Sequence, residues 1–289
     1  MLTSGLRLRR ASSGFTLVEL IMVIVIMGIV GGMVAVFMKS PIDAYFASSR
    51  RAGLTDLADT AVRRIARDMR KALPNSVHAP TNQCVEFIPT KTGARYRAQG
   101  TGSLNFGSAV TSFNMLGSTS TFAGSALPTD QQIQPNDLIA ISNLGFDVGD
   151  AYAGTNTAAI SSVVDGSESV ITIPATIPST TFSVALASPS NRFQVIPSAE
   201  KVVAFVCSGG NLYRTANGAM TKTVDGSACA TSGVATMSVA TLAKNVSFCS
   251  LTYSGSDLQR NALVQMTFQF TDTGETTSVY HEVHVNNTP

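Results

Sequence analysis

A single carboxylate stands inside a long apolar stretch near the N-terminus. Within residues 15–38, Glu19 has the only ionisable side chain. A charge in the middle of a bilayer costs roughly 2.5 to 3.5 kcal/mol on insertion scales, so a carboxylate at such a place indicates a function and needs a partner. Glu19 is therefore the first candidate for chemistry: either it pairs with a positive group, or it lies near the interface and merely snorkels to water or is protonated.

Four cysteines are the second candidate group, because an even number in an oxidising compartment can form two disulfides. They are Cys84, Cys207, Cys229 and Cys249, and they allow three connectivities. We favour Cys207 with Cys229, which closes a local hairpin region, and Cys84 with Cys249, which ties an early strand to the last ones. The sequence itself does not choose among the three. A zinc site is disfavoured, because the cysteine gaps are irregular and contain no C-x-x-C pair.

The three histidines do not indicate a catalytic or metal site. His78 has no acid or nucleophile motif near it in the sequence. His281 and His284 are three residues apart on an expected strand, which points them to opposite faces. Residues 91–97 are interpreted as a hairpin rather than a phosphate-binding loop, and no other common catalytic motif occurs. The sequence therefore predicts a protein that is not an enzyme and has no cofactor or metal.

The apolar stretch is long enough to cross a membrane as a helix, since about 20 apolar residues suffice. Three arginines precede it without any acid, at positions 7, 9 and 10, and only Lys39 follows closely. By the positive-inside rule, the N-terminus lies in the cytoplasm and the bulk of the chain is exported across the membrane.

Glycine and proline residues are expected to weaken this helix. Gly28, Gly31 and Gly32 lie inside it, where each glycine costs about 1 kcal/mol relative to alanine. They form either a packing face for other helices or a segment that loosens when the helix leaves the bilayer. Pro41 is expected to kink or break the helix.

Residues 39–73 continue as an amphipathic helix that Pro74 closes. The apolar positions recur at spacings of three and four: Leu54, Leu57, Ala58, Ala61, Val62, Ile65, Met69 and Leu73. This segment has eight basic and four acidic residues, whereas residues 74–289 have nine basic and thirteen acidic ones. Either neighbouring subunits meet with the basic helix against the acidic body, or the charges form a solvated face with intrahelical pairs.

Residues 74–289 are expected to form a β-rich body, so the fold class is α+β with a long N-terminal helix packed on mostly antiparallel strands. Residues 98–135 are interpreted as an irregular insertion. Turns are expected at 208–211 and 272–274, and the last three strands should form a meander. The expected strands are 84–88, 137–141, 169–173, 193–196, 202–206, 212–214, 246–253, 262–270 and 276–285.

The composition excludes two broad classes of protein. Of the 289 residues, 44% are hydrophobic and only 13% are charged, which does not fit a disordered chain. The formal net charge is +2, so no global field attracts nucleic acid. Any charge-dependent function must be local.

The order of the N-terminal features resembles the type IV prepilin signature of pilins and type II secretion pseudopilins. The matching string is Gly-Phe-Thr-Leu-Val-Glu-Leu at residues 14–20, preceded by a basic leader, residues 1–14. The resemblance implies cleavage after Gly14, N-methylation of Phe15, and pairing of Glu19 with the Phe15 amine of a neighbouring subunit. It thereby divides the chain into the leader, the assembly half of the helix at 15–38, the amphipathic half at 39–73 and the body.

Partners and location follow from the same resemblance. The implied partners are the prepilin peptidase and methylase, other major and minor pilins, the inner-membrane assembly platform and, before assembly, membrane lipid. The implied location is the inner membrane, with the body facing the periplasm, and then the pilus or cell surface.

A second resemblance concerns residues 50–78, 93–97 and 280–289, which look like the MshO group of minor pilins of the mannose-sensitive haemagglutinin (MSHA) pilus. It implies a low-copy subunit at the tip or in initiation. PilW-like minor pilins and J-type pseudopilins share the same plan. The alternatives are a type II secretion minor pseudopilin and a pilus-tip adhesin or DNA-uptake module, although the acidic body argues against nucleic acid.

Overall fold

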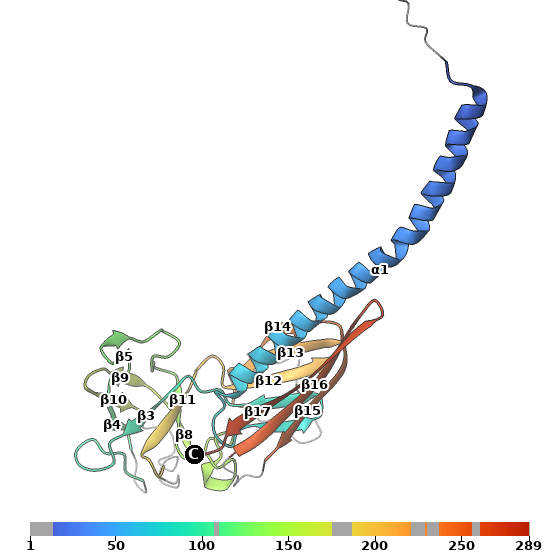
Figure 1. Ribbon diagram of the computed structural model, residues 1–289. Coiled ribbons are helices and arrows are strands. Elements are labelled where there is room, and N and C mark those ends of the chain that lie inside the picture. Colours follow the sequence, from blue (N-terminus) through green and yellow to red (C-terminus); the bar gives the residue numbers. More distant parts are fainter. Residues whose placement is uncertain are drawn as a thin grey trace, which may run out of the picture. The chain divides into compact units, whose positions relative to one another are not determined.

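The chain consists of two compact units, Met1–Ala52 and Gly53–Pro289. It has an α+β fold with a long N-terminal helix and an antiparallel β-rich C-terminal body (Figure 1). The expected leader lies outside the described residues except for Gly14. The computed structural model describes residues 14–106, 110–174, 187–220, 229, 237–255 and 261–288.

Helix α1 spans Leu17–Met69 without interruption. A break at Pro41 is therefore excluded, because a proline removes one intrahelical hydrogen bond and leaves the neighbouring turns in place. The alternative expectation, a kink at Pro41, stays a prediction. The expected end at residue 73 is wrong. After Met69 the chain leaves the helix, and the Leu73 N–H donates instead to the Ile88 carbonyl oxygen at 2.8 Å.

The apolar face expected on the second half of the helix is confirmed. Leu54, Ile65 and Met69 are at most 5% exposed, while Leu57 is half-buried. They pack with side chains from a five-stranded and a three-stranded sheet into one core. Burying a large aliphatic side chain contributes roughly 1.5 to 3 kcal/mol, so these sheets are what holds this half of the helix in place.

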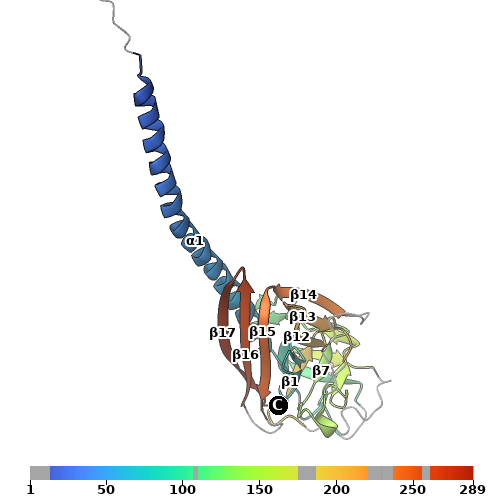
Figure 2. The same cartoon turned by 90° about the vertical axis from the view of Figure 1, so that its right-hand side faces the viewer.

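Two antiparallel sheets share that core. The five-stranded sheet has the order β1-β2-β12-β13-β14, with β1 at His78–Thr81, β2 at Cys84–Phe87, β12 at Val202–Ser208, β13 at Asn211–Asn217 and β14 at Met237–Ala243. The three-stranded sheet is the expected meander, with β15 at Val246–Ser254, β16 at Asn261–Asp272 and β17 at Glu275–Asn286 (Figure 2).

Both expected turns are confirmed. Gly209 and Gly210 join β12 to β13, and both have positive φ, as do Thr273 and Gly274 between β16 and β17. A two-residue hairpin loop with positive φ at both positions matches the right-handed twist of the flanking strands. The turns thus fix the register of both hairpins.

A third sheet is inserted in sequence between β2 and β12 and has its own core. Its order is β8-β7-β11-β3-β4-β10-β9, and every pairing among these described strands is antiparallel. The strands are β3 at Thr92–Tyr96, β4 at Ser112–Leu116, β7 at Leu138–Ala140, β8 at Thr157–Ala159, β9 at Ser162–Val164, β10 at Glu168–Thr172 and β11 at Arg192–Ile196.

Two expectations about this inserted sheet are wrong. Residues 91–97 contain the single strand β3 rather than a hairpin, because β11 and β4 pair with it on either side. Residues 98–135 are not wholly irregular, since they contain β4 and the short hairpin of β5 at Thr121–Phe122 and β6 at Ser125–Ala126. A 3-10 turn, η1, follows at Asp147–Gly149.

The expected disulfide pairing is also wrong. The structure pairs Cys84 with Cys229 and Cys207 with Cys249, with Cα–Cα distances of 6.0 and 6.4 Å. The reason is strand register. Cys84 lies opposite Val206 on β12, and successive side chains on a strand point to opposite faces, so Cys84 and Cys207 lie on different faces of the sheet. Cys207 faces the core with Cys249, while Cys84 joins Cys229 in a separate cluster.

Candidate assembly site

The first turn of α1 is capped by a side chain. The Glu19 N–H donates to the Thr16 hydroxyl oxygen at 3.3 Å, and the Leu20 N–H donates to the Thr16 carbonyl oxygen at 3.2 Å. Thr16 is therefore the N-cap and Glu19 is the third helical residue, the spacing of a capping box. The sequence reasoning missed this role of Thr16, although the T-x-x-E pattern was the available signal.

The capping geometry also gives Glu19 a favourable electrostatic position. The N-terminus of a helix carries a partial positive charge, and a carboxylate in the first turn is stabilised there by about 0.3 to 1 kcal/mol. Glu19 is exposed, so its carboxylate is available to a second positive group as well as to the helix.

The peptide bond between Gly14 and Phe15 lies just before the helix. Both residues are exposed, and Phe15 is 81% exposed. A Cβ added at Gly14 meets no atom within 4 Å, so nothing in the part of the chain that the structure describes requires glycine at this position.

The first half of α1 exposes its apolar surface on all sides. Every large apolar side chain from Phe15 to Phe46 is exposed. The helix is long and apolar enough to cross a membrane, and no residue of its most apolar window is buried. Cβ atoms added at Gly28, Gly31 and Gly32 likewise meet nothing within 4 Å. That these glycines form a packing face for other helices, or a segment where the helix loosens, stays a prediction.

The second half of α1 carries an ionic contact with the body. Arg214 on β13 donates from Nε to the Asp68 carboxylate at 2.9 Å and from Nη2 to the Glu200 carboxylate at 2.8 Å. The hydrogen bonds from Arg214 lower the pKa of Glu200, with a smaller contribution from the charge of Arg64. This contact ties the last turns of the helix to the five-stranded sheet.

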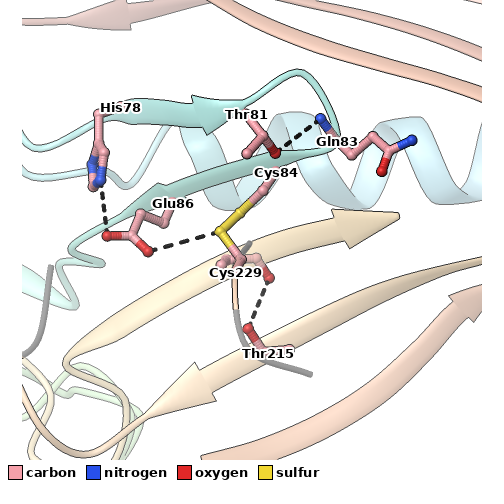
Figure 3. Close-up of a disulfide and its surroundings, with 8 residues drawn as sticks. His78, Thr81, Gln83, Cys84, Glu86, Thr215 and Cys229 are labelled. Atoms are coloured by element: carbon pink, nitrogen blue, oxygen red, sulfur yellow. Dashed lines mark hydrogen bonds and ion pairs between the residues drawn. A yellow bond between two sulfur atoms is a disulfide. The ribbon is translucent and has the colours of Figure 1, made fainter. Parts of the chain in front are cut away.

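His78 has an acidic neighbour that sequence reasoning missed. His78 on β1 lies opposite Glu86 on β2, and His78 Nε2 is 3.0 Å from Glu86 Oε1 (Figure 3). The Glu86 carboxylate also lies near the Cys84–Cys229 disulfide, 4.0 Å from the Cys229 sulfur. No local motif could have indicated this pair, because the register of β1 and β2 brings the two residues together.

Tyr152 completes this cluster by packing edge-on against His78, and its hydroxyl donates to the Ser76 carbonyl oxygen at 3.0 Å. Burial raises the pKa of Tyr152, and the carboxylates of Glu86 and Asp150 raise it further. The tyrosine thus stays protonated and acts as a hydrogen-bond donor. His281 and His284, by contrast, point to opposite faces of β17, as the sequence predicted.

The comparisons with known proteins identify the N-terminal segment. The family model of the prokaryotic N-terminal methylation motif matches residues 9–35. No curated protein and no solved structure matches the chain.

This match agrees with the geometry of the N-terminus and concerns the N-terminal segment alone. Residues 9–35 carry a type IV prepilin-like signal, which indicates a pilin-like or pseudopilin substrate of prepilin peptidase that is processed and assembled with other pilins. Such a motif points to a structural subunit rather than an enzyme. The single N-terminal apolar helix indicates membrane anchoring.

Proposed function

We propose that the chain is a minor type IV pilin-like subunit that enters a filament through the first half of α1. The observation that carries the proposal is the prepilin-like signal on a helix whose first half is exposed, while its second half is packed against the body. Cleavage separates Gly14 from Phe15, and methylation keeps a positive charge on the new amine of Phe15.

The role of Glu19 follows from the position of that amine. The mature N-terminus lies one residue before the Thr16 cap, where its positive charge adds to the positive end of the helix dipole. A carboxylate from a neighbouring helix offsets this charge in an apolar environment, in which ion pairs are screened little. The Glu19 of one subunit and the Phe15 amine of the next then set the axial register, while the apolar surfaces of the helices pack.

The body favours a minor subunit over a shaft subunit. The inserted sheet adds a second hydrophobic core to the one that holds the helix. A low-copy position at the tip or in initiation accommodates this added bulk better than a repeating position. The MshO-like residues at 50–78, 93–97 and 280–289 support the MSHA pilus as the system.

The test is to express the full chain with and without a prepilin peptidase and to measure its N-terminus by mass spectrometry. We expect N-methylated Phe15 only when the peptidase is present. An intact Met1, or cleavage beyond residue 38, would contradict the proposal. In a piliated host, Glu19→Ala should be cleaved and inserted normally but recovered poorly from sheared filaments, and Glu19→Asp is the matched control that keeps the charge.

A second candidate function is a binding module at the filament tip, such as an adhesin. The inserted sheet favours it, because its strands form a separate core and exposed Phe122 lies on the β5–β6 hairpin. Deleting the inserted sheet together with the β5–β6 hairpin should then abolish attachment of the filament to its target and leave incorporation of the subunit into the filament intact. A type II secretion pseudopilin has the same front end, and the partner subunits recovered with the chain distinguish the two systems.

A further inference from the structure

The last strand, β17, has a long free edge. It pairs with β16 over twelve consecutive residue pairs without a bulge, and it is the outer strand of the meander (Figure 2). In the described part of the chain, the backbone of residues 276–286 has hydrogen bonds only to β16. A regular, unpaired edge of this length is a template for another strand unless something covers it.

The opposite edge of the same meander is covered. Leu251 on β15 donates its N–H to the Asn82 carbonyl oxygen at 2.7 Å, and Val246 donates to the Gly210 carbonyl oxygen at 2.9 Å. The register of β15 also shifts near its start. Among the described residues, the chain therefore protects one edge with its own loops and leaves the other edge without a backbone partner.

A groove of about 900 Å³ runs between the free edge and helix α1. Val62 and Ala66 of the helix and Val279 of the strand supply apolar lining. The groove lies wholly within the Gly53–Pro289 unit. Val279 and His281, two residues apart on β17, both line it.

Four arginines make the helical wall of the groove basic: Arg63, Arg64, Arg67 and Arg70. The Arg63 Nε donates to the Asp59 carboxylate at 2.6 Å, and Arg64 influences Glu200 electrostatically. Arg67 and Arg70 are exposed, and neither has a side-chain hydrogen bond or ion pair with any residue that the structure describes. As far as the chain is described, the groove thus offers the positive charges of Arg67 and Arg70 without a counter-charge, beside strand backbone without a partner.

We propose that this groove is the docking site for an acidic β-strand of a neighbouring, different pilin-type subunit. The incoming strand pairs with the edge of β17 and places its carboxylates against Arg67 and Arg70, so that main-chain hydrogen bonds give affinity and charge gives selectivity. The partner's identity as a pilin-type subunit rests on the proposed function. A second copy fits poorly, because pairing through its own β17 would bring the arginines of its helix α1, which lies beside that strand, towards the arginines of this groove.

The binding test uses the full chain in detergent micelles and a fluorescent peptide of about ten residues with alternating threonine and glutamate, a length typical of long strands. A control peptide replaces the threonines with proline, which keeps the charge but removes backbone donors. We expect the first peptide to bind and to protect β17 amides from hydrogen exchange. Equal binding of the proline peptide would overturn strand pairing.

The variant test is the double charge reversal Arg67→Glu with Arg70→Glu. The matched control reverses Arg95 and Arg192, two exposed arginines that lie opposite each other on β3 and β11. We expect about tenfold weaker peptide binding for the groove variant, because two favourable charge contacts become repulsive, and no change for the control. Unchanged peptide affinity in a groove variant that unfolds at the wild-type temperature would overturn the proposal. So would a single-stranded DNA oligonucleotide of equal charge that binds the protein more tightly than the acidic peptide does.

A photo-crosslinking residue at Ser278 tests the partner in assembled filaments. An adduct with an acidic strand of an identified, different subunit supports the proposal, while no adduct, or an adduct with a basic segment, overturns it. The N-terminus is measured on the same sample. A methylated Phe15 without an adduct rejects only the docking site. An unprocessed N-terminus rejects the proposed function. The peptide-binding measurement does not depend on processing of the N-terminus.

Discussion

The two halves of helix α1 are continuous in backbone but differ in what surrounds them. Residues 17–46 expose every large apolar side chain, whereas Leu54, Ile65 and Met69 are buried against two sheets of the same chain. The second half is thus part of a folded body, and the first half leaves its apolar surface for lipid or for other helices. The contrast teaches that one helix can complete a core within its own chain at one end and supply a contact surface at the other.

The largest expected effect on stability comes from a comparison of two isoleucine-to-alanine substitutions, one in each half of the helix. Ile65 is fully buried and Ile24 is 63% exposed. Ile65→Ala should destabilise the body by about 2 to 5 kcal/mol, because it leaves a cavity in the core. Ile24→Ala should leave the unfolding transition of the body unchanged. Thermal and denaturant unfolding of the full chain in detergent measures both, and equal effects would contradict the contrast.

The next effect concerns the disulfide that joins the two sheets around the packed half. Replacing Cys207 and Cys249 with serine should cost about 2 to 4 kcal/mol, since the cross-link limits the unfolded chain. It should also speed hydrogen exchange of residues 54–69. The matched control replaces Cys84 and Cys229, which lie on the other sheet face and should leave exchange in the helix unaltered. Faster helix exchange in the control would count against this assignment of roles.

A smaller effect is expected from Arg214→Ala, which removes the ionic contact between helix and body. The contact is partly exposed, so we expect a loss of only about 1 kcal/mol at neutral pH.

The same contact predicts a pH dependence. Arg214 lowers the folded-state pKa of Glu200 below its ordinary 4.5, so the stabilisation is complete above that value and is lost as the pH falls through the lowered pKa. Stability curves measured from pH 7 down to the acid transition should therefore converge for wild type and variant. Parallel curves would show that Glu200 does not contribute.

The smallest effect on the stability of the body is expected from a change in the exposed half of the helix. Thr16→Ala removes the side-chain cap and should weaken the first turn by about 1 kcal/mol, while Thr16→Ser, which can also cap, is the control. Hydrogen exchange at residues 18–20 should quicken in the alanine variant only, and body unfolding should stay the same. Unchanged exchange would mean that the cap does not hold the first turn.

Much of the fold could be predicted because it depends on local pattern. Spacings of three and four identified the buried face that includes Ile65, and alternating runs with turn residues identified the meander and both hairpin turns. The strand β4 was missed because Ser, Thr and Gly surround it, and its place inside the sheet comes from pairing with β3 and β10. The extent of the helix was misjudged for a related reason, since Leu73 bonds to Ile88, a residue distant in sequence.

The candidate site divides in the same way. Gly14, Phe15 and Glu19 lie within one short motif, residues 14–20, so the sequence alone was enough to single them out. The pairing of Cys207 with Cys249 and the contact of His78 with Glu86 depend on register across strands. A shift of one residue reverses the face to which a side chain points, and no local signal specifies register over such separations.

The sequence by itself determined the prepilin-like signal, the apolar and amphipathic halves of the helix, and the β-rich character of the body, because each is written in neighbouring residues. Only the tertiary structure decided the disulfide partners, the inserted sheet with its own core, and the free edge of β17 beside Arg67 and Arg70. These features arise where segments far apart in the chain meet, and which segments meet depends on the burial and backbone pairing of the whole body.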